Sequence, residues 1–417
     1  MKLFSTLKRP FLVLIPVLAI IGPGIISGSV DNDAGGIATY SLAGAHFGYS
    51  LLWIVFLTTF ALAVTQEIGA RMGIVTGKGL ASLVRERFGI RWTAFIMVVL
   101  FIANIGVIAA EFAGIGASLE IFHIPRYVSV PFAAVAIYFF VSKGNFKSLE
   151  RLFLLLSSFY IVYIVSAVLA KPDWGKALSS LVIPTFHLQK DYLLTVIAVI
   201  GTTITPWGQF FIQDYVVDKK LSVDDLRIER GDVFFGSFLT NVISFFIIVA
   251  CAATIYVSGK SILTAADAAV ALSPLAGHFA TILFAFGLFN AAIFGAALVP
   301  VATSYVITEA FGFESGLNFA FREAPEFYIL FGVSLGIGAL LVILPFVPLL
   351  AVLFLTQALN AILLLPVFVF LYILANDKKI LGSYSNHKIT NGVVLLTFFL
   401  IAIVSLIYFI SLFVFPT

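Results

Sequence analysis

The stretch SGSVDNDAGGIAT, residues 27–39, decides the fold of this chain, because it places two carboxylates and three glycines inside an otherwise apolar span. A charged side chain at the centre of a bilayer costs about 2.5–3.5 kcal/mol even on insertion scales, so it persists where it faces a cavity, a partner or an ion. The glycines beside Asp31 and Asp33 indicate that the helix is interrupted there. A helix broken at mid-membrane exposes backbone carbonyls and half-helix ends, which is the usual cation-site architecture of secondary transporters.

The composition predicts an integral membrane protein. Of the 417 residues, 61% are hydrophobic and 11% are charged, and the mean hydropathy is +1.12. A membrane span needs about 20 apolar residues, and successive apolar blocks take up nearly the whole length, so we expect no separate soluble domain. Cys251 is the single cysteine, which excludes an internal disulfide. Lys2, Lys8 and Arg9 begin the chain like a secretory signal, but the many later spans favour a retained first helix.

Eleven apolar spans are predicted, and short charged loops separate them. The first is interrupted near 31–36 and the sixth near 205–208. The charged run 214–232 is predicted to be a solvated loop. The predicted spans are 11–46, 49–72, 91–121, 127–143, 150–170, 189–217, 232–258, 275–311, 326–346, 348–374 and 390–414.

The second interruption lies in the sequence TTITPWGQ, residues 202–209. Pro206 removes a backbone donor, and Gly208 loosens the next turn. Interruptions in the first and sixth spans, five spans apart, are typical of two inverted five-span repeats with the site between the two breaks. We therefore expect one transmembrane transporter domain over 1–417, with repeats at about 11–170 and about 189–374 and an extra helix at about 390–414.

The basic residues predict the orientation. If the N-terminus is cytoplasmic, every lysine and arginine falls on the cytoplasmic side except Arg126, Lys171, Lys176, Lys190 and Lys260. This asymmetry follows the positive-inside rule. With an odd number of spans, the C-terminus then lies outside. We expect the protein to reside in a bacterial cell (inner) membrane.

Several motifs are similar to those of one transporter family. The segment GPG precedes the first break, IAT follows it, and FGYSLLW leads into the second span. The segment RMGIVTGK ends the second span and continues beyond it, and AEFAG lies in the third span. These five segments occupy residues 22–24, 37–39, 47–53, 71–78 and 110–114. The tenth span adds Gln357, Asn360, Ala361 and Pro366. Together these motifs resemble the NRAMP family of divalent-metal transporters, which has the all-helical LeuT fold with broken first and sixth helices.

Departures from the family pattern are informative. Where the family has Asp-Pro-Gly-Asn, this chain has Asp-Ala-Gly-Gly at 33–36, so the aspartate stays and the asparagine ligand is lost. The family's Met-Pro-His in the sixth span is Thr-Pro-Trp at 205–207, which removes a thioether and a histidine associated with proton movement. The family also has an acid three residues before Glu111, and that position is Ile108 here.

These substitutions look like those of the NRAMP-related magnesium transporters. Magnesium takes oxygen ligands and gives up its water reluctantly, whereas sulfur ligands favour softer metals. The resemblance implies a wide, all-oxygen, wet pocket and transport of Mg²⁺, and also of Mn²⁺, without obligatory proton coupling. A divalent ion crossing about 100 mV gains about 4–5 kcal/mol. The expected metal-site residues are Asp33, Gly36, Thr202, Thr205 and Gln357, with Asp31, Glu111, Trp207 and Asn360 behind them.

The carboxylates also have structural interpretations. Asp33 could cap a helix near the membrane edge, but the paired break favours the role of principal ligand. Asp31 either points into the same cavity or caps the second half-helix. Glu111 either pairs with a basic residue or lines the aqueous route, and the second role is favoured.

The neutral residues carry similar alternatives. Thr202 and Thr205 could bond back to helix carbonyls, Gln357 could form an interhelical hydrogen bond, and Trp207 could be plain packing. The histidines lie near span ends or in loops without metal-ligand spacing; they are His46, His123, His187, His278 and His387.

Two other functions compete with the magnesium carrier. A proton-coupled Mn²⁺ or Fe²⁺ importer of the same family conflicts with the missing titratable groups. A LeuT-fold amino-acid carrier holds a substrate carboxylate at half-helix N-termini, and two acids at the break would repel that group. An enzyme is not expected, because no nucleophile, base and orienting group combine and no phosphate-binding glycine loop is present. The expected partners are the transported cation and the lipid bilayer, with no resident cofactor and no nucleic acid.

Overall fold

The computed structural model describes residues 32–143, 158–260, 262–317 and 319–414, and every regular element within these ranges is helical. Eight helical segments of the described chain are long and apolar enough to cross a bilayer: Leu52–Thr76, Ile90–Glu120, Lys190–Asp218, Val223–Tyr256, Ala280–Phe311, Pro325–Ile343, Leu349–Ala375 and Lys388–Leu412. The predicted all-helical membrane fold is confirmed. The first half of the predicted span 11–46 and the start of the predicted span 150–170 lie outside the described residues.

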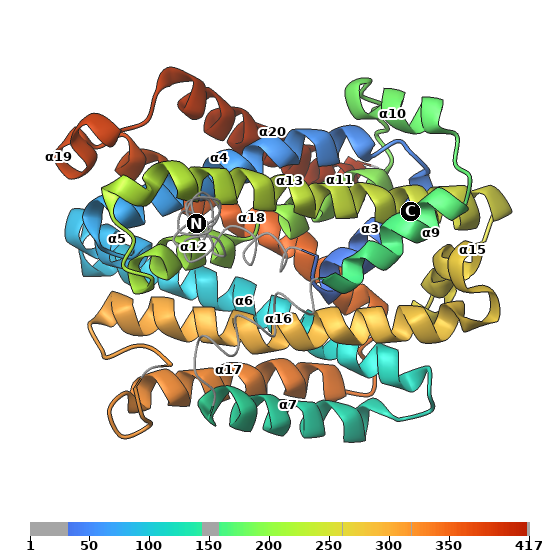
Figure 1. Cartoon of the computed structure of the whole chain (residues 1–417), viewed down its shortest axis with the longest axis horizontal. Helices are drawn as coiled ribbons and strands as arrows, with labels where there is room; N and C mark the ends of the chain where they lie inside the picture. Colours follow the sequence, from blue (N-terminus) through green and yellow to red (C-terminus); the bar gives the residue numbers. More distant parts are fainter. Residues whose placement is uncertain (1–31, 144–157, 261, 318, 415–417) are drawn as a thin grey trace, which may run out of the picture.

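The principal helices cross the molecule roughly parallel to one another (Figure 1). The helices and their bounds are α3 (Ala34–Phe47), α4 (Leu52–Thr76), α5 (Leu80–Phe88), α6 (Ile90–Glu120), α7 (Arg126–Lys143), α9 (Ile161–Leu169), α10 (Trp174–Val182), α11 (Lys190–Thr203), α12 (Pro206–Asp218), α13 (Leu226–Cys251), α14 (Ala265–Ala268), α15 (Ser273–Ala276), α16 (Ala280–Phe311), α17 (Pro325–Ile343), α18 (Leu349–Ala375), α19 (Lys378–Leu381) and α20 (Lys388–Val414).

The two ends of the helix bundle differ in their loops. Figure 1 shows α5 and α19 at one end and α10 and α15 at the other. We call the first the basic end, because Lys78, Arg87, Lys219 and Lys379 lie in or beside its loops. The second is called the opposite end. The short helices α5, α10, α14, α15 and α19 cross no membrane, and the sequence analysis did not predict them.

The centre of the bundle is packed around α6, α16 and α18, with the broken helices beside them. Glycines allow the closest approaches. A Cβ on Gly114 of α6 would lie 2.4 Å from the Cβ of Ala34 in α3, and a Cβ on Gly44 would lie 2.4 Å from the carbonyl of Ile248 in α13. Such distances are below van der Waals contact, so these backbones pack together only because the side chains are absent.

The prediction of a solvated loop over 214–232 is wrong. Helix α12 continues to Asp218 and α13 begins at Leu226, so only a short connection separates them, and Asp214, Glu229 and Asp232 are buried. Charges in this run follow helical periodicity: the acids lie on the inward face of α13 together with Val233, while the arginines face out. The high charge content of this run suggested that it is exposed to solvent. The helical spacing of Glu229, Asp232 and Val233 instead marks the face of α13 that is buried.

The carboxyl group of Asp214 meets a second, half-buried acid at the basic end. Oε1 of Glu309, near the end of α16, accepts hydrogen bonds from Gly79 N–H at 3.0 Å and from Ser82 Oγ at 2.7 Å. A Cβ on Gly79 would lie 2.1 Å from Glu309 Oε2 and 2.2 Å from Asp214 Oδ1. The two acids therefore converge on this glycine and bring α12, α16 and the loop before α5 together.

Candidate cation site at the two helix breaks

Asp33 stands directly before α3, at the first predicted break. Its backbone is extended, with φ −63° and ψ −176°, and its Oδ1 accepts the N–H of Gly36 at 2.6 Å. This is the N-cap geometry that aspartate favours, because the first helical N–H groups have no partner within the helix. Asp33 therefore caps α3 and is 2% exposed. The predicted site residue Asp31, for which a capping role was one alternative, lies outside the described residues.

Asn32 lies in the turn directly before the cap, and three hydrogen bonds hold it there. Its Nδ2 donates to the carbonyl of Thr240 at 3.1 Å, and its Oδ1 accepts from Ser244 Oγ at 3.0 Å. Its own carbonyl accepts from the hydroxyl of Tyr160 at 2.8 Å. This residue was not predicted from the sequence, although an asparagine between two aspartates in an apolar span was a usable signal. Its three partners, Thr240, Ser244 and Tyr160, anchor the start of α3 to other helices of the bundle.

Glu111 of α6 lies at the same break. It is fully buried, its Oε2 accepts the N–H of Ala34 at 3.4 Å, and the carboxyl groups of Glu111 and Asp33 are within hydrogen-bonding reach of each other. A Cβ on Gly295 of α16 would lie 2.4 Å from Glu111 Cδ, so this glycine makes room for the carboxyl group. Apart from this contact with the Asp33 carboxyl group, Oε1 of Glu111 has no hydrogen-bond partner among the described residues.

The second break separates α11 from α12, as the sequence predicted. Helix α11 ends at Thr203, and Thr205 caps α12 by accepting the N–H of Gly208 at 3.3 Å. Pro206 occupies the first helical position, where its missing N–H is not needed. Thr202 is 1% exposed, and its hydroxyl has no hydrogen-bond partner in the part of the chain that the structure describes.

Gln357 of α18 connects the two breaks. A Cβ on Gly35 would lie 1.8 Å from Gln357 Nε2, and a Cβ on Gly201 of α11 would lie 2.0 Å from the Gln357 carbonyl. Asn360 donates from Nδ2 to Gln357 Oε1 at 3.0 Å. Helix α18 therefore passes directly against both broken helices, and its two buried amides lie where they meet.

A cluster of unpartnered polar atoms surrounds the breaks. Buried polar groups in proteins nearly always have hydrogen-bond partners, so unpartnered ones gathered at one place are suited to an incoming ligand. Among the described residues, no group of three or more His, Cys, Asp or Glu side chains forms a metal site. The donors are instead two carboxylates with neutral groups. Counting partners within the described ranges alone, the unpartnered atoms at the breaks are Glu111 Oε1, Thr202 Oγ1, Gln209 Oε1, Gln357 Nε2, Asn360 Oδ1 and Trp207 Nε1.

Apolar side chains occupy the two positions that differ from the family's titratable residues. Trp207 is 1% exposed and packs against Phe211, with 5.8 Å between the ring centroids. Ile108 is fully buried against α17, where a Cβ on Gly338 would lie 2.4 Å from Ile108 Cγ2. Neither side chain can carry a proton.

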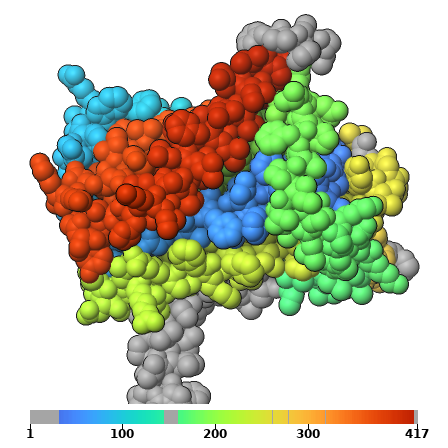
Figure 2. All heavy atoms as spheres, turned by 90° about the horizontal axis from the view of Figure 1, so that it is seen from above, coloured from blue at the N-terminus to red at the C-terminus, as the bar shows by residue number. Residues whose placement is uncertain are grey.

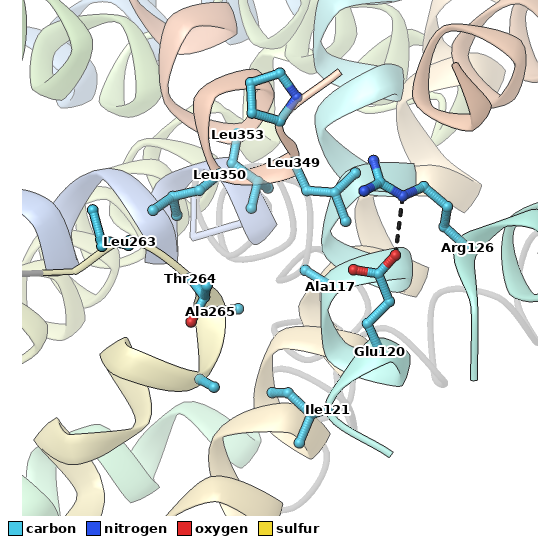
Figure 3. A pocket seen from close by; sticks show the side chains of 12 residues that line it. Ala117, Glu120, Ile121, Arg126, Leu263, Thr264, Ala265, Leu349, Leu350 and Leu353 are labelled. Atoms are coloured by element: carbon cyan, nitrogen blue, oxygen red, sulfur yellow. Dashed lines mark hydrogen bonds and ion pairs between the residues drawn. The ribbon is translucent and has the colours of Figure 1, made fainter. Parts of the chain in front are cut away.

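A cavity of about 390 Å³ opens at the opposite end of the bundle (Figure 3). Glu120 and Arg126 form an ion pair of 3.0 Å on one side, and leucines of α18 line the wall. The innermost of these, Leu353, also contacts the first break, since a Cβ on Gly35 would lie 3.2 Å from its carbonyl. Leu353 therefore lies between the cavity, which it lines, and Gly35 at the first break.

Comparisons with known proteins agree with this geometry. The family model described as natural resistance-associated macrophage protein-like (Nramp) matches residues 24–411. The divalent metal cation transporter MntH of Deinococcus radiodurans is 26% identical over 314 residues, which is 71% of this chain and 70% of that protein.

Solved structures show the fold. A crystal structure of the Eremococcus coleocola manganese transporter superposes with a TM-score of 0.76 at 20% identity, covering 95% of this chain and 86% of that chain. MhsT in complex with L-phenylalanine superposes with a TM-score of 0.57 at 13% identity, covering 93% and 98%. The predicted LeuT fold is confirmed. Because the family model spans most of the sequence, the chain belongs to the Nramp family of divalent-metal transporters, and it is a membrane transporter rather than an enzyme.

Proposed function

We propose that this transporter carries hard divalent cations, Mg²⁺ first and Mn²⁺ as well, through a site between its two helix breaks. The observation that carries the proposal is the donor set: the side chains at the breaks offer carboxylate, hydroxyl and amide oxygens. Thr205 stands where the family has a methionine, and Trp207 where it has a histidine. Oxygen ligands suit Mg²⁺, and losing the thioether removes the preference for softer metals.

Asp33 is the principal ligand in this proposal. Its cap bond to Gly36 uses one oxygen, and a carboxylate has lone pairs for further contacts. The hydroxyls of Thr202 and Thr205 supply neutral oxygens, and Gly36 lines the site with its backbone in the first turn of α3. Gln357 presents Nε2 toward Gly35, so it must turn its amide by half a rotation to offer oxygen to a cation.

Four further residues support these ligands without binding the ion themselves in this proposal: Asp31, Glu111, Trp207 and Asn360. Glu111 places a second carboxyl group beside Asp33. Asn360 Nδ2 donates to Gln357 Oε1 at 3.0 Å, so Asn360 must turn its own amide together with Gln357. Gly36 has no side chain where the family has an asparagine, which leaves room for water on the ion. Because Mg²⁺ dehydrates reluctantly, a site that keeps several waters in place favours it.

Transport without obligatory proton coupling follows from the apolar environment of the relay positions. Ile108 packs on Gly338 and Trp207 packs on Phe211, so neither position exchanges a proton with the site. The membrane potential can drive entry alone, since two charges crossing about 100 mV gain about 4–5 kcal/mol. In this proposal the chain consists of two inverted repeats, about 11–170 and about 189–374, and its basic end is cytoplasmic.

The second candidate is a proton-coupled manganese importer. The names of the relatives favour it: MntH of Deinococcus radiodurans is a divalent metal cation transporter, and the Eremococcus coleocola protein is a manganese transporter. The pair of Asp33 and Glu111 is the observation in the structure that supports it, because two adjacent carboxyl groups can share a proton.

Uptake of Mg²⁺ and Mn²⁺ into liposomes that contain the purified protein tests the proposal. We expect both ions to enter under a negative interior potential, and excess Mg²⁺ to compete with Mn²⁺. Empty liposomes give the background. Mn²⁺ uptake that even millimolar Mg²⁺ leaves unchanged would contradict the magnesium assignment and favour the second candidate.

A further inference from the structure

A polar cavity of about 500 Å³ lies at the basic end, far along α4 from the helix breaks. Its floor is α4, and its walls come from α13, from the start of α20 and from the loop before α20. Figure 2 shows α4 in blue between α20 in red and α13 in yellow-green. The lining residues are Val64, Glu67, Arg71, Arg230, Phe234, Ser383, Tyr384, Ser385, His387 and Thr390.

The cavity holds one more fixed positive charge than negative charge. Glu67 accepts from Nε of Arg71 at 3.0 Å and from Nε of Arg230 at 2.7 Å, so one carboxylate faces two guanidinium groups. Arg71 is 3% exposed, and its terminal nitrogens donate to the Tyr384 carbonyl and, at 2.7 Å, to Asn386 Oδ1. These bonds hold the buried arginine and the loop before α20 in place.

Arg230 is the arginine that can take a ligand. Its side chain is 48% exposed, and within the described residues its single hydrogen-bonding contact is through Nε to Glu67. Both terminal nitrogens therefore keep their donors. Ser383, Ser385 and His387 line the same cavity. A guanidinium group beside hydroxyl donors is the arrangement that recognises phosphate oxygens.

The surface next to the cavity is apolar. One face of α4 carries, at helical spacing, Phe60, Val64, Glu67 and Arg71. The α4 surface that forms the floor of the cavity therefore changes from apolar to ionic within about three turns. Phe60 is 52% exposed, and on α13 Phe238 is 60% exposed. An anion bound by Arg230 therefore has a hydrocarbon-compatible groove beside it, in the part of the chain that crosses the bilayer.

We propose that this cavity binds the phosphate headgroup of an anionic phospholipid, whose acyl chains lie along the groove over α4 between α13 and α20. Basic pockets between membrane helices bind anionic headgroups in this way. A free phosphate ion would satisfy Arg230 but would leave the apolar groove unused. The bound lipid would join α4, α13 and the loop before α20, and so stabilise the helices that pack beside the first break. This inference does not depend on which cation is transported.

The test measures lipid binding directly. Purified wild-type protein, Arg230→Gln and the matched control Arg227→Gln are each titrated with phosphatidylglycerol, phosphatidylcholine and inorganic phosphate. Arg227 is exposed one turn earlier on α13 and lies outside the cavity, so its variant removes the same charge without removing a contact. Native mass spectrometry counts bound lipids, and the melting midpoint reports stabilisation.

We expect phosphatidylglycerol to bind the wild type and Arg227→Gln about equally, with a rise in melting midpoint. Loss of the charge-assisted contacts in Arg230→Gln should weaken that binding about tenfold or more, and Arg230→Lys should restore part of it. Equal binding of phosphatidylcholine would overturn the proposal, as would equal affinity in Arg230→Gln and Arg227→Gln. Stabilisation by inorganic phosphate at the same concentration as the lipid would show a free-anion site and would also overturn it.

Discussion

The backbone N–H of Ala34 lies 3.4 Å from Oε2 of Glu111, so the first turn of α3 and the middle of α6 share one carboxylate. Asp33 stands one residue before this contact and reaches the same carboxyl group. The first break is therefore a point where a helix N-terminus and two acidic side chains converge. The positive end of the helix dipole reduces the repulsion between the two acids, and a cation would offset it more fully.

The two roles of Asp33 can be separated by two substitutions. Asp33→Asn keeps an oxygen that can cap α3 but loses the charge, whereas Asp33→Ala loses both. We expect both variants to abolish divalent-ion flux, and we expect Asp33→Ala alone to lose about 1 kcal/mol of stability from the missing cap. Flux into liposomes and thermal unfolding in detergent measure the two effects. Wild-type flux from a folded Asp33→Asn protein would show that the residue is a cap and not the ligand.

Metal preference should follow the donor atoms. Thr205→Met combined with Gly36→Asn restores the family's thioether and amide, and should shift preference from Mg²⁺ toward Mn²⁺ and softer metals. Thr205→Ala with Gly36→Asn is the control, because it also removes the cap of α12 but adds no sulfur. Competition between Mg²⁺ and Mn²⁺ during uptake gives the selectivity ratio. An identical ratio in the wild type and the double variant would count against the assigned ligands.

The contact between α11 and α18 should be intolerant of added volume. A Cβ on Gly201 would lie 2.0 Å from the Gln357 carbonyl and 2.6 Å from the backbone nitrogen of Ala361, both of which are rigid. Gly201→Ala should therefore destabilise the protein by about 1–3 kcal/mol and reduce flux by displacing Gln357. Gly336→Ala in α17, where a Cβ would meet nothing within 4 Å, is the matched control. Equal melting midpoints for the two variants would argue against this packing.

Both helix breaks were predictable from the sequence because their signals are local. A proline, paired glycines and aspartates inside apolar runs mark the predicted interruptions near Asp33 and Pro206. The structure shows a helix that begins directly after Asp33 and a break between α11 and α12 at Pro206. The choice between Asp31 and Asp33 as the cap depends on where the helix begins to within two residues, which composition does not determine.

Other features depended on contacts between distant parts of the chain. Asn32 is held by Tyr160 and Ser244, and Asp214 meets Glu309, yet nothing in either local sequence identifies these partners. The wrong prediction of a solvated loop over 214–232 has the same cause. A run of acidic residues is expected to be exposed to solvent unless a distant segment packs over it. The cavity at Arg230 depends on the loop before α20, which approaches α4 only in the folded protein.

Because Asp33 and Glu111 could share a proton, a measurement of proton movement during transport tests most directly the claim that Mg²⁺ uptake is not coupled to protons. Mg²⁺ uptake into proteoliposomes is recorded together with luminal pH while the membrane voltage is clamped, for the wild type and Glu111→Gln. We predict that Mg²⁺ enters without acidifying the lumen, and that a pH gradient alone does not concentrate it. Acidification that requires the metal and disappears in Glu111→Gln would contradict the account, because it would show that this carboxylate replaces the missing relay at Ile108 and Trp207.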